Sequence, residues 1–356
     1  MKTKDSSSIK RILVLRFRQI GDSILAAALC STLKRTFLEA RIDFVLNKGI
    51  APLFEGHPDI DRVIAFDRDE LKSTRRYVAK VWRTVREGRY DVIIDMRSTT
   101  RTLLFSLFSL RTPWRIGRRK KYAFGLLTHQ VDNYSPTLHT DMVQRDLMLA
   151  EPLSDIADID YTDDFRLYVT DGEREDMRRR MATAGIDFNR PVWLIGVTTK
   201  IADKRWRTDY MTEMLRRLMA ERPELQFIFN YAPGQEEDYA REAYEALGRP
   251  SVVKIDVEAR SLRELAALTA NCDFYFGNEG GARHLAHALG KPSFVVCSPF
   301  GQPDTWIPRN AVAAMGISAD DVTTPAERAG LTPRQTFDLL TPDAVYPRLQ
   351  DFLQSL

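Results

Sequence analysis

The chain has little cysteine and little net charge, and it has no long hydrophobic run. Its 356 residues include 3 cysteines, and 52 basic side chains nearly balance 49 acidic ones, which leaves a formal charge of +3. So small an excess argues against a dedicated nucleic-acid-binding protein. Cys30, Cys272 and Cys297 lie far apart in apolar segments. They indicate reduced core residues and exclude a disulfide framework or a cysteine metal cluster.

The N-terminal stretch also lacks the features of a targeting segment. The apolar run at residues 12–15 is interrupted at once by Arg16 and Arg18. A signal peptide needs a longer apolar run, and a membrane helix needs about 20 apolar residues. We therefore expect a cytoplasmic protein that does not span a membrane, although it can touch a membrane surface.

What the sequence has is an alternation of strand-like and helix-like segments. Short apolar runs of strand length occur at 11–17, 42–47, 62–66, 90–96, 191–199, 226–231, 273–277 and 293–298. Helical spacing occurs between most of them, for example at 24–37 and 261–272. Strands of this length that alternate with helices predict βαβ units and mostly parallel sheets.

The alternation stops once, in an acidic stretch of poor periodicity near residues 155–172. We therefore predict an α/β protein of two Rossmann-like domains that face each other across a cleft. The expected boundaries are 1–160 and 173–340, followed by an amphipathic terminal helix at 341–356. Ligands of such sheets bind at the carboxyl ends of the strands, so the loops that follow strands are the candidates for chemistry.

The first such loop covers residues 18–22 and contains Gly21 and Asp22. It does not have the GxGxxG pattern of a dinucleotide site. Asp is among the preferred N-cap residues, so the spacing alone favours a helix cap for Asp22 over a catalytic role.

The second loop, at 198–206, offers the hydroxyls of Thr198 and Thr199 and the cations Lys200 and Lys204. Phosphate oxygens attract such donors, although a solvated surface loop is the more common interpretation.

In the third loop, at 277–292, Gly277, Gly280 and Gly281 surround a strand-to-helix turn. Backbone N–H groups there could bind an anion such as a nucleotide diphosphate. His284 and His287 share a helix face, but no third ligand of suitable spacing accompanies them. We therefore favour packing over a metal site and expect no metal and no cofactor.

A basic cluster lies at 115–121, beside Trp114 and Tyr122. Its cations are Arg115, Arg118, Arg119, Lys120 and Lys121. A solvated face and a binding surface for an anionic ligand are equally consistent with such a run.

The order of these segments resembles glycosyltransferase family nine, the ADP-heptose:lipopolysaccharide heptosyltransferases of the GT-B fold. The likeness covers nearly the whole chain. It runs through the opening strand with its GD loop, GHPDIDRVIAF, YDVIIDMRSTTRTLLFSL with RIG, TTKIADKRW, APGQEEDYA, the segment at 261–292 and FGQPDTWIP.

The resemblance implies a role for each matching residue. It makes Asp22 the catalytic base and Lys204 the donor-phosphate lysine, with Thr198 and Thr199 on the same loop. Glu236 or Glu237 would hold the ribose, and Gly280, Gly281 and His284 would bind the diphosphate. The basic cluster would meet an anionic saccharide acceptor and the membrane surface. The chain departs from the family pattern at Glu279, which replaces Asp, at Gly280, which replaces Ser or Thr, and at Ala28, which replaces Pro.

The expected function is inverting transfer of heptose from an ADP-sugar donor to the lipopolysaccharide core, without nucleic acid as a partner. Two alternatives stay open. The chain could use a different nucleotide sugar, or it could be a catalytically silent GT-B module that binds saccharide.

Overall fold

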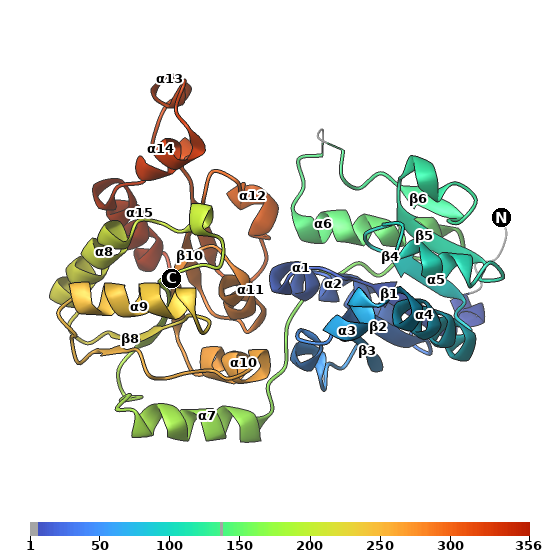
Figure 1. The fold of residues 1–356 in the computed structure, drawn as a ribbon, viewed down its shortest axis with the longest axis horizontal. Helices are drawn as coiled ribbons and strands as arrows, with labels where there is room; N and C mark the ends of the chain where they lie inside the picture. Colours follow the sequence, from blue (N-terminus) through green and yellow to red (C-terminus); the bar gives the residue numbers. More distant parts are fainter. Residues whose placement is uncertain (1–5, 136–137) are drawn as a thin grey trace. The chain divides into compact units, whose positions relative to one another are not determined.

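The computed structural model describes residues 6–135 and 138–356. It divides into two compact units, residues 1–168 and 169–356. Each unit holds one parallel six-stranded sheet with helices packed around it (Figure 1).

The sheet of the first unit is built around two strands that are buried on both faces. Its strands are β1 (Arg11–Leu15), β2 (Arg41–Asn47), β3 (Arg62–Phe66), β4 (Val92–Asp95), β5 (Trp114–Arg118) and β6 (His129–Val131), in the order β3-β2-β1-β4-β5-β6. The continuous apolar runs of β1 and β4 suit the centre of a parallel sheet. The helices are α1 (Ile20–Leu25), α2 (Ala27–Thr36), α3 (Arg68–Lys72), α4 (Thr74–Gly88), α5 (Leu103–Leu107) and α6 (Met142–Leu147).

The second unit repeats this plan. Its strands are β7 (Val192–Gly196), β8 (Gln226–Phe229), β9 (Val253–Lys254), β10 (Phe274–Asn278), β11 (Ser293–Val296) and β12 (Ala314–Ile317), in the order β12-β11-β10-β7-β8-β9. Its helices are α7 (Asp171–Thr183), α8 (Thr208–Glu221), α9 (Gln235–Ala246), α10 (Leu262–Ala270), α11 (Gly281–Ala288), α12 (Pro303–Trp306), α13 (Pro325–Arg328), α14 (Pro333–Asp338) and α15 (Pro342–Gln354).

Both sheets have the same strand order. Numbered within each unit, it is 3-2-1-4-5-6, so the order reverses between β1 and β4 and again between β7 and β10. The predicted fold class, an α/β protein of two Rossmann-like halves, is thereby confirmed. The loops that follow these four strands flank the switch points, where such sheets bind ligands.

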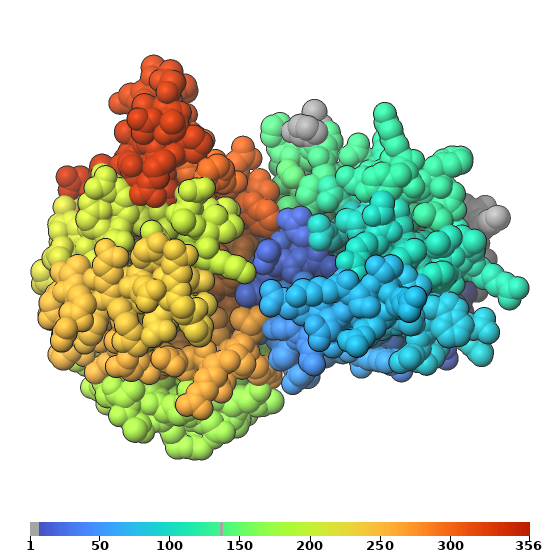
Figure 2. Space-filling model, in the orientation of Figure 1, coloured from blue at the N-terminus to red at the C-terminus, as the bar shows by residue number. Residues whose placement is uncertain are grey.

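The C-terminal helix of the second unit, α15, is held in place by packing. In α15, Val345, Leu349 and Phe352 lie in the same core as strand residues of the second sheet. The segment with α13 and α14 projects from the surface of this unit (Figure 2).

In the described residues, no helix is long and apolar enough to cross a bilayer.

The acidic stretch before the unit boundary belongs to the first unit. Thr32 of α2 donates its hydroxyl to the carbonyl of Thr162 and accepts from the N–H of the same residue, both at 3.1 Å. Arg35 of α2 binds Asp160 through two hydrogen bonds. These hydrogen bonds hold residues 160–162 against α2.

The three cysteines are buried free thiols, as predicted. Burial raises the pKa of both Cys272 and Cys297 to about 12, so these thiols stay protonated.

Candidate functional site

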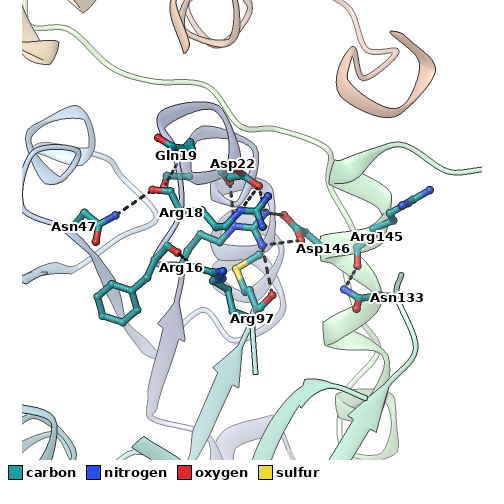
Figure 3. A network of polar contacts seen from close by, with 12 residues as sticks. Arg16, Arg18, Gln19, Asp22, Asn47, Arg97, Asn133, Arg145 and Asp146 are labelled. Carbon is teal, nitrogen blue, oxygen red and sulfur yellow. Dashed lines mark hydrogen bonds and ion pairs between the residues drawn. The ribbon is translucent and has the colours of Figure 1, made fainter. Parts of the chain in front are cut away.

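In the first unit, Asp22 lies in the first turn of α1, just after β1 (Figure 3). Its Oδ1 accepts hydrogen bonds from Arg16 Nη2 and Arg18 Nε, each at 3.2 Å. The helix N-cap is Gln19, and no side chain caps the helix. The helix-cap interpretation of Asp22 is therefore wrong, because its carboxylate turns toward two guanidinium groups instead of the backbone.

The buried guanidinium of Arg16 joins two carboxylates. Its Nη2 lies 3.2 Å from Asp22 Oδ1 and 3.3 Å from Oδ2 of Asp146, which is carried on α6. Arg16 and Asp146 are almost completely buried. Burial raises the pKa of Asp146 to about 6, because its desolvation outweighs the attraction of Arg16. No described residue donates a hydrogen bond to Oδ2 of Asp22, so this oxygen stays available to a ligand.

A pocket of about 570 Å³ opens at the carboxyl ends of β1 and β4, and Arg18, Arg97 and Arg101 line it. Arg97 donates to the carbonyl of Phe17 at 2.6 Å, which ties the two loops together. Burial and the neighbouring charges of Arg18 and Arg16 lower the pKa of Arg97. Three cations in one pocket favour an anionic ligand such as a phosphate.

The loop after β4 is held in an unusual conformation. Asp95 Oδ1 accepts the backbone N–H groups of Arg97 and Ser98 at 3.0 and 2.8 Å. Ser98 has φ +49°, a region that few non-glycine residues adopt. Arg97 and Arg101 were not among the residues expected from the sequence. Their position after a buried central strand was the signal that could have identified them.

The predicted basic cluster is only partly a surface. Arg115 lies on β5, is buried, and donates to the carbonyls of Leu110, Thr112 and Leu126. It therefore holds chain segments together and is not open to an acceptor. The reason is that both faces of this parallel sheet are covered, so the three central residues of β5 are all buried and Arg115 is one of them.

The other cations of the cluster are reachable. The guanidinium of Arg118 lies 3.2 Å from the ring centroid of Tyr134. Arg119 is exposed and 3.8 Å from Asp132. Lys121 is exposed and Lys120 half-buried, close in sequence to the exposed ring of Phe124.

In the second unit, Lys204 and Glu279 form an ion pair after β7 and β10. Lys204 Nζ lies 2.5 Å from Glu279 Oε1, which also accepts from Ser298 Oγ at 3.0 Å. A Cβ on Gly301 would come within 2.5 Å of Glu279 Oε2, so this glycine leaves room for the carboxylate. The structure thus brings the predicted phosphate lysine to the residue that departs from the family pattern.

Asn278 positions this pair, and the sequence analysis missed it. Its Oδ1 accepts the N–H of Trp206 at 2.7 Å, and its Nδ2 donates to the carbonyl of Gly196 at 2.8 Å. The loop with Lys204 is thereby fixed to the ends of both β7 and β10. In the same loop the hydroxyl of Thr198 is buried with no hydrogen-bond partner among the described residues, and Thr199 is half-buried.

The glycines of the predicted anion-binding turn differ in what they require. Gly277 has φ +139°, and a Cβ there would come within 2.5 Å of the carbonyl oxygen of Gly196. Gly280 is the N-cap of α11 in an extended conformation, with open space around it. The backbone N–H groups of Gly281, Ala282 and Arg283 begin α11 and precede its first i→i−4 hydrogen bond, so they can face an anion.

His284 lies in this first turn but is buried. It contacts Arg283 and packs edge-on against Trp306, with ring centroids 6.2 Å apart. Burial, followed by the charge of Arg283, lowers the pKa of His284 well below its ordinary value, so the ring is neutral. His287 bonds to Asn310 at 2.7 Å. Within residues 6–135 and 138–356, no three His, Cys, Asp or Glu side chains are grouped as a metal site requires.

The two glutamates proposed for the ribose are not equivalent. Glu237 pairs with Arg241 on its own helix at 2.9 Å. Glu236 is half-buried at the start of α9, where burial raises its pKa and Lys200 partly offsets that effect. Glu236 is therefore the better candidate.

Comparisons with known proteins agree with this arrangement of loops. The family model described as Glycosyltransferase family 9 (heptosyltransferase) matches residues 78–305. The curated lipopolysaccharide heptosyltransferase 3 of Escherichia coli K12 is 26% identical over 299 residues, which cover 81% of each chain.

Two solved structures are similar over nearly their full lengths. A family 9 glycosyl transferase from Veillonella parvula has a TM-score of 0.83 at 16% identity and covers 99% of this chain and 98% of its own. The E. coli ADP-heptose lps heptosyltransferase II has a TM-score of 0.74 at 22% identity, with 97% and 99% covered. At these identities the structures support the fold alone.

Proposed function

The chain belongs to glycosyltransferase family 9, and on that premise we propose that it transfers heptose from ADP-heptose to the lipopolysaccharide core with inversion at the anomeric carbon. That it is an enzyme of glycosyl transfer follows from the family. The donor, the acceptor and the residue roles are the proposal. The names of relatives support the donor and acceptor, because they include lipopolysaccharide heptosyltransferases and an ADP-heptose enzyme.

The donor is assigned to the switch point of the second sheet. Lys204 and the first N–H groups of α11 would face the diphosphate, with Thr198 and Thr199 as hydroxyl donors and Glu236 at the ribose. The observation that carries this assignment is the position of Lys204 Nζ, 2.5 Å from the residue that directly precedes the Gly280–Gly281 turn. A cation and helix N-terminal amides stabilise a departing diphosphate by preorganised charge.

The acceptor is assigned to the arginine-lined pocket of the first sheet. Arg18, Arg97 and Arg101 suit a phosphorylated saccharide, and Arg18 also contacts Asp22. The acceptor hydroxyl would lose its proton to Oδ2 of Asp22 as its oxygen attacks the anomeric carbon. The bond from that carbon to the diphosphate breaks, and ADP leaves with the electron pair.

We place this reaction in the cytoplasm, because all three cysteines are free thiols, which fits a reducing compartment. The predicted domain functions stay proposals as well, with the acceptor assigned to the first unit and the nucleotide sugar to the second.

A panel of nucleotide sugars tests the proposal. We expect calorimetric binding of ADP and ADP-heptose and weaker binding of UDP and GDP sugars, together with transfer of heptose detected by mass spectrometry. Transfer from another nucleotide sugar would favour the alternative of a different donor, with Glu279 contributing to its selection. Saccharide binding with neither transfer nor donor hydrolysis would favour the silent module.

A further inference from the structure

An apolar groove lies along one side of α4, next to the chain that follows α5. Tyr77, Val81 and Val85 of this helix are buried. The groove is lined by residues of α4 together with Phe108, which follows α5: Thr74, Arg75, Val78, Ala79, Trp82 and Phe108. Trp82 is 51% exposed, and Leu107 and Leu110 beside Phe108 are 41% and 56% exposed.

Helix α4 and the turn after α5 also carry exposed arginines without counter-charges. The side chains of Arg75, Arg76, Arg83, Arg86 and Arg111 are exposed. None of them forms an ion pair with a described carboxylate, whereas Arg166, Arg179 and Arg207 elsewhere on the surface each do. Arg86 lies over the ring of Trp82, 5.6 Å from its centroid. We call Trp82, Leu107, Phe108, Leu110 and these five arginines the α4 surface.

We propose that the α4 surface binds an anionic phospholipid bilayer. Trp82 and Phe108 would enter the headgroup region, and the surrounding arginines would contact lipid phosphates. Exposed aromatic and leucine side chains together with arginines that have no counter-charge match both parts of such an interface, its apolar interior and its negative surface. A nucleic acid would use the arginines and the aromatic rings but would leave the leucines unmatched.

Helix α4 lies between the groove and the acceptor pocket. A role for membrane binding in acceptor delivery rests on the proposed function. Tyr77 lines the arginine pocket assigned to the acceptor, while Val78, the next residue, lines the groove. Arg101 of that pocket donates to the carbonyl of Leu71, just before α4. A bilayer on the α4 surface would therefore lie next to the pocket that receives a lipid-anchored saccharide.

Vesicle sedimentation of the full chain tests the proposal without catalysis. We expect the wild type to bind vesicles of phosphatidylethanolamine with 30% phosphatidylglycerol at least tenfold more tightly than vesicles of phosphatidylcholine, with weaker binding at high salt. The pair Arg83→Glu and Arg86→Glu should reduce binding to the anionic vesicles at least tenfold. The pair Arg260→Glu and Arg348→Glu makes the same charge change at exposed positions of the second unit and should bind as the wild type does.

The apolar part is tested by Trp82→Gln, with Leu38→Gln as the control at another exposed apolar residue of the first unit. We expect a severalfold loss of vesicle binding in the first variant only. Equal binding to both vesicle types, or equal losses in the control pair, would overturn the proposal. So would a wild-type dimer in lipid-free buffer that Trp82→Gln dissociates, because the surface would then join two copies.

The failure of this inference can be told from failure of the proposed function. Transfer to a deacylated, water-soluble acceptor should be unchanged in the α4 variants, since none of the substituted residues lines the acceptor pocket. No transfer by a wild type that binds vesicles would contradict the proposed function and leave the membrane surface standing.

Discussion

At the scale of single residues, the two oxygens of Asp22 have different surroundings. Oδ1 accepts hydrogen bonds from two guanidinium groups, whereas Oδ2 accepts none from a described residue and is the oxygen that the proposed mechanism uses as the base. In Asp22→Asn we expect turnover to fall about a hundredfold or more, because a positioned general base contributes about 10²–10⁴-fold. ADP affinity should hardly change. Turnover, ADP affinity and thermal midpoint measured on one preparation give the result.

The buried Arg16 makes a control necessary, because Asp22→Asn also removes one of its two counter-charges. Asp146→Asn removes the other one and leaves Asp22 intact. If Asp22 served only to neutralise Arg16, the two variants would lose stability and turnover to similar extents. A loss of turnover confined to Asp22→Asn supports the base, and near-normal turnover in a stable Asp22→Asn protein contradicts it.

Lys204 gives a second prediction, because in the proposed donor site its partner Glu279 would compete with the phosphate for the ammonium group. Lys204→Ala should weaken ADP binding about tenfold or more, the usual effect of losing a charge-assisted hydrogen bond. Glu279→Gln should strengthen ADP binding severalfold, because it frees the lysine. Calorimetry with ADP, which carries no heptose, separates this effect from any contact of Glu279 with heptose. Unchanged affinity in both variants would remove Lys204 from the phosphate site.

The sequence predicted the candidates at the ends of strands better than it predicted their partners. Asp22, Lys204 and the Gly280–Gly281 turn follow central strands, so local pattern and resemblance were enough to select them. Asp146 lies 130 positions from Arg16 in the sequence, and no local sequence pattern predicts a contact between residues so far apart in the chain. Arg115 was misjudged because the charged run contains the strand β5, whose three central residues are all buried in a sheet that is covered on both faces.

At the scale of elements, the end of β10 depends on one glycine. Gly277→Ala should destabilise the second unit by about 2 kcal/mol or more, because the new Cβ meets the backbone of β7 at a positive φ. Gly280→Ala, three residues on, has open space and an extended backbone, and should leave stability within about 0.5 kcal/mol. Urea unfolding of both variants tests this. Equal stabilities would contradict the close approach of the two strands.

Helices α7 and α10 are joined by a charge pair that makes stability depend on pH. Arg263 donates to both oxygens of Glu173, at 2.6 and 2.7 Å, and these bonds lower the pKa of Glu173 to about 2. A lowered carboxyl pKa adds stability that is complete above the ordinary value of 4.5 and is lost as the pH falls toward 2. Because the pair is partly exposed, we expect Glu173→Gln to cost about 1 kcal/mol at pH 7.

Urea unfolding between pH 7 and pH 3 should show that difference shrinking as the pH falls. Glu175→Gln, on the same helix with its nearest cation 3.9 Å away, is the control and should stay near the wild type throughout. A difference for Glu173→Gln that does not depend on pH would argue that the charge is not its source.

Among elements, the central strands were predicted well, and so was the edge strand β3, expected at 62–66 and found at Arg62–Phe66. The strands β5, β6, β9 and β12 were not predicted. β1, β4, β7 and β10 are apolar runs that stand out from their surroundings. β6, β9 and β12 are short strands toward the sheet edges with mixed burial, so their sequences carry little pattern. The single helix expected at 24–37 is two, α1 and α2, which meet at Ala26.

At the scale of the whole molecule, each unit has its own sheet and its own core. The chain passes from one unit to the other once, between Tyr168 and Val169. Because α15 packs into the second core, a fragment of residues 169–356 should fold and keep the ADP affinity of the full chain within a few-fold. Calorimetry and circular dichroism of the fragment test this. A folded fragment that does not bind ADP would contradict the assignment of the donor to this unit.

The single chain connection between the two units also has a consequence for gene recombination. A genetic exchange at the codons for residues 168 and 169 carries each sheet over whole, with every loop that flanks its switch point. With the acceptor and the donor assigned to the two units as proposed, recombination between two family genes at this point would exchange acceptor specificity and donor specificity separately. We expect lineages of the two halves to disagree more often in this family than lineages of segments within one half.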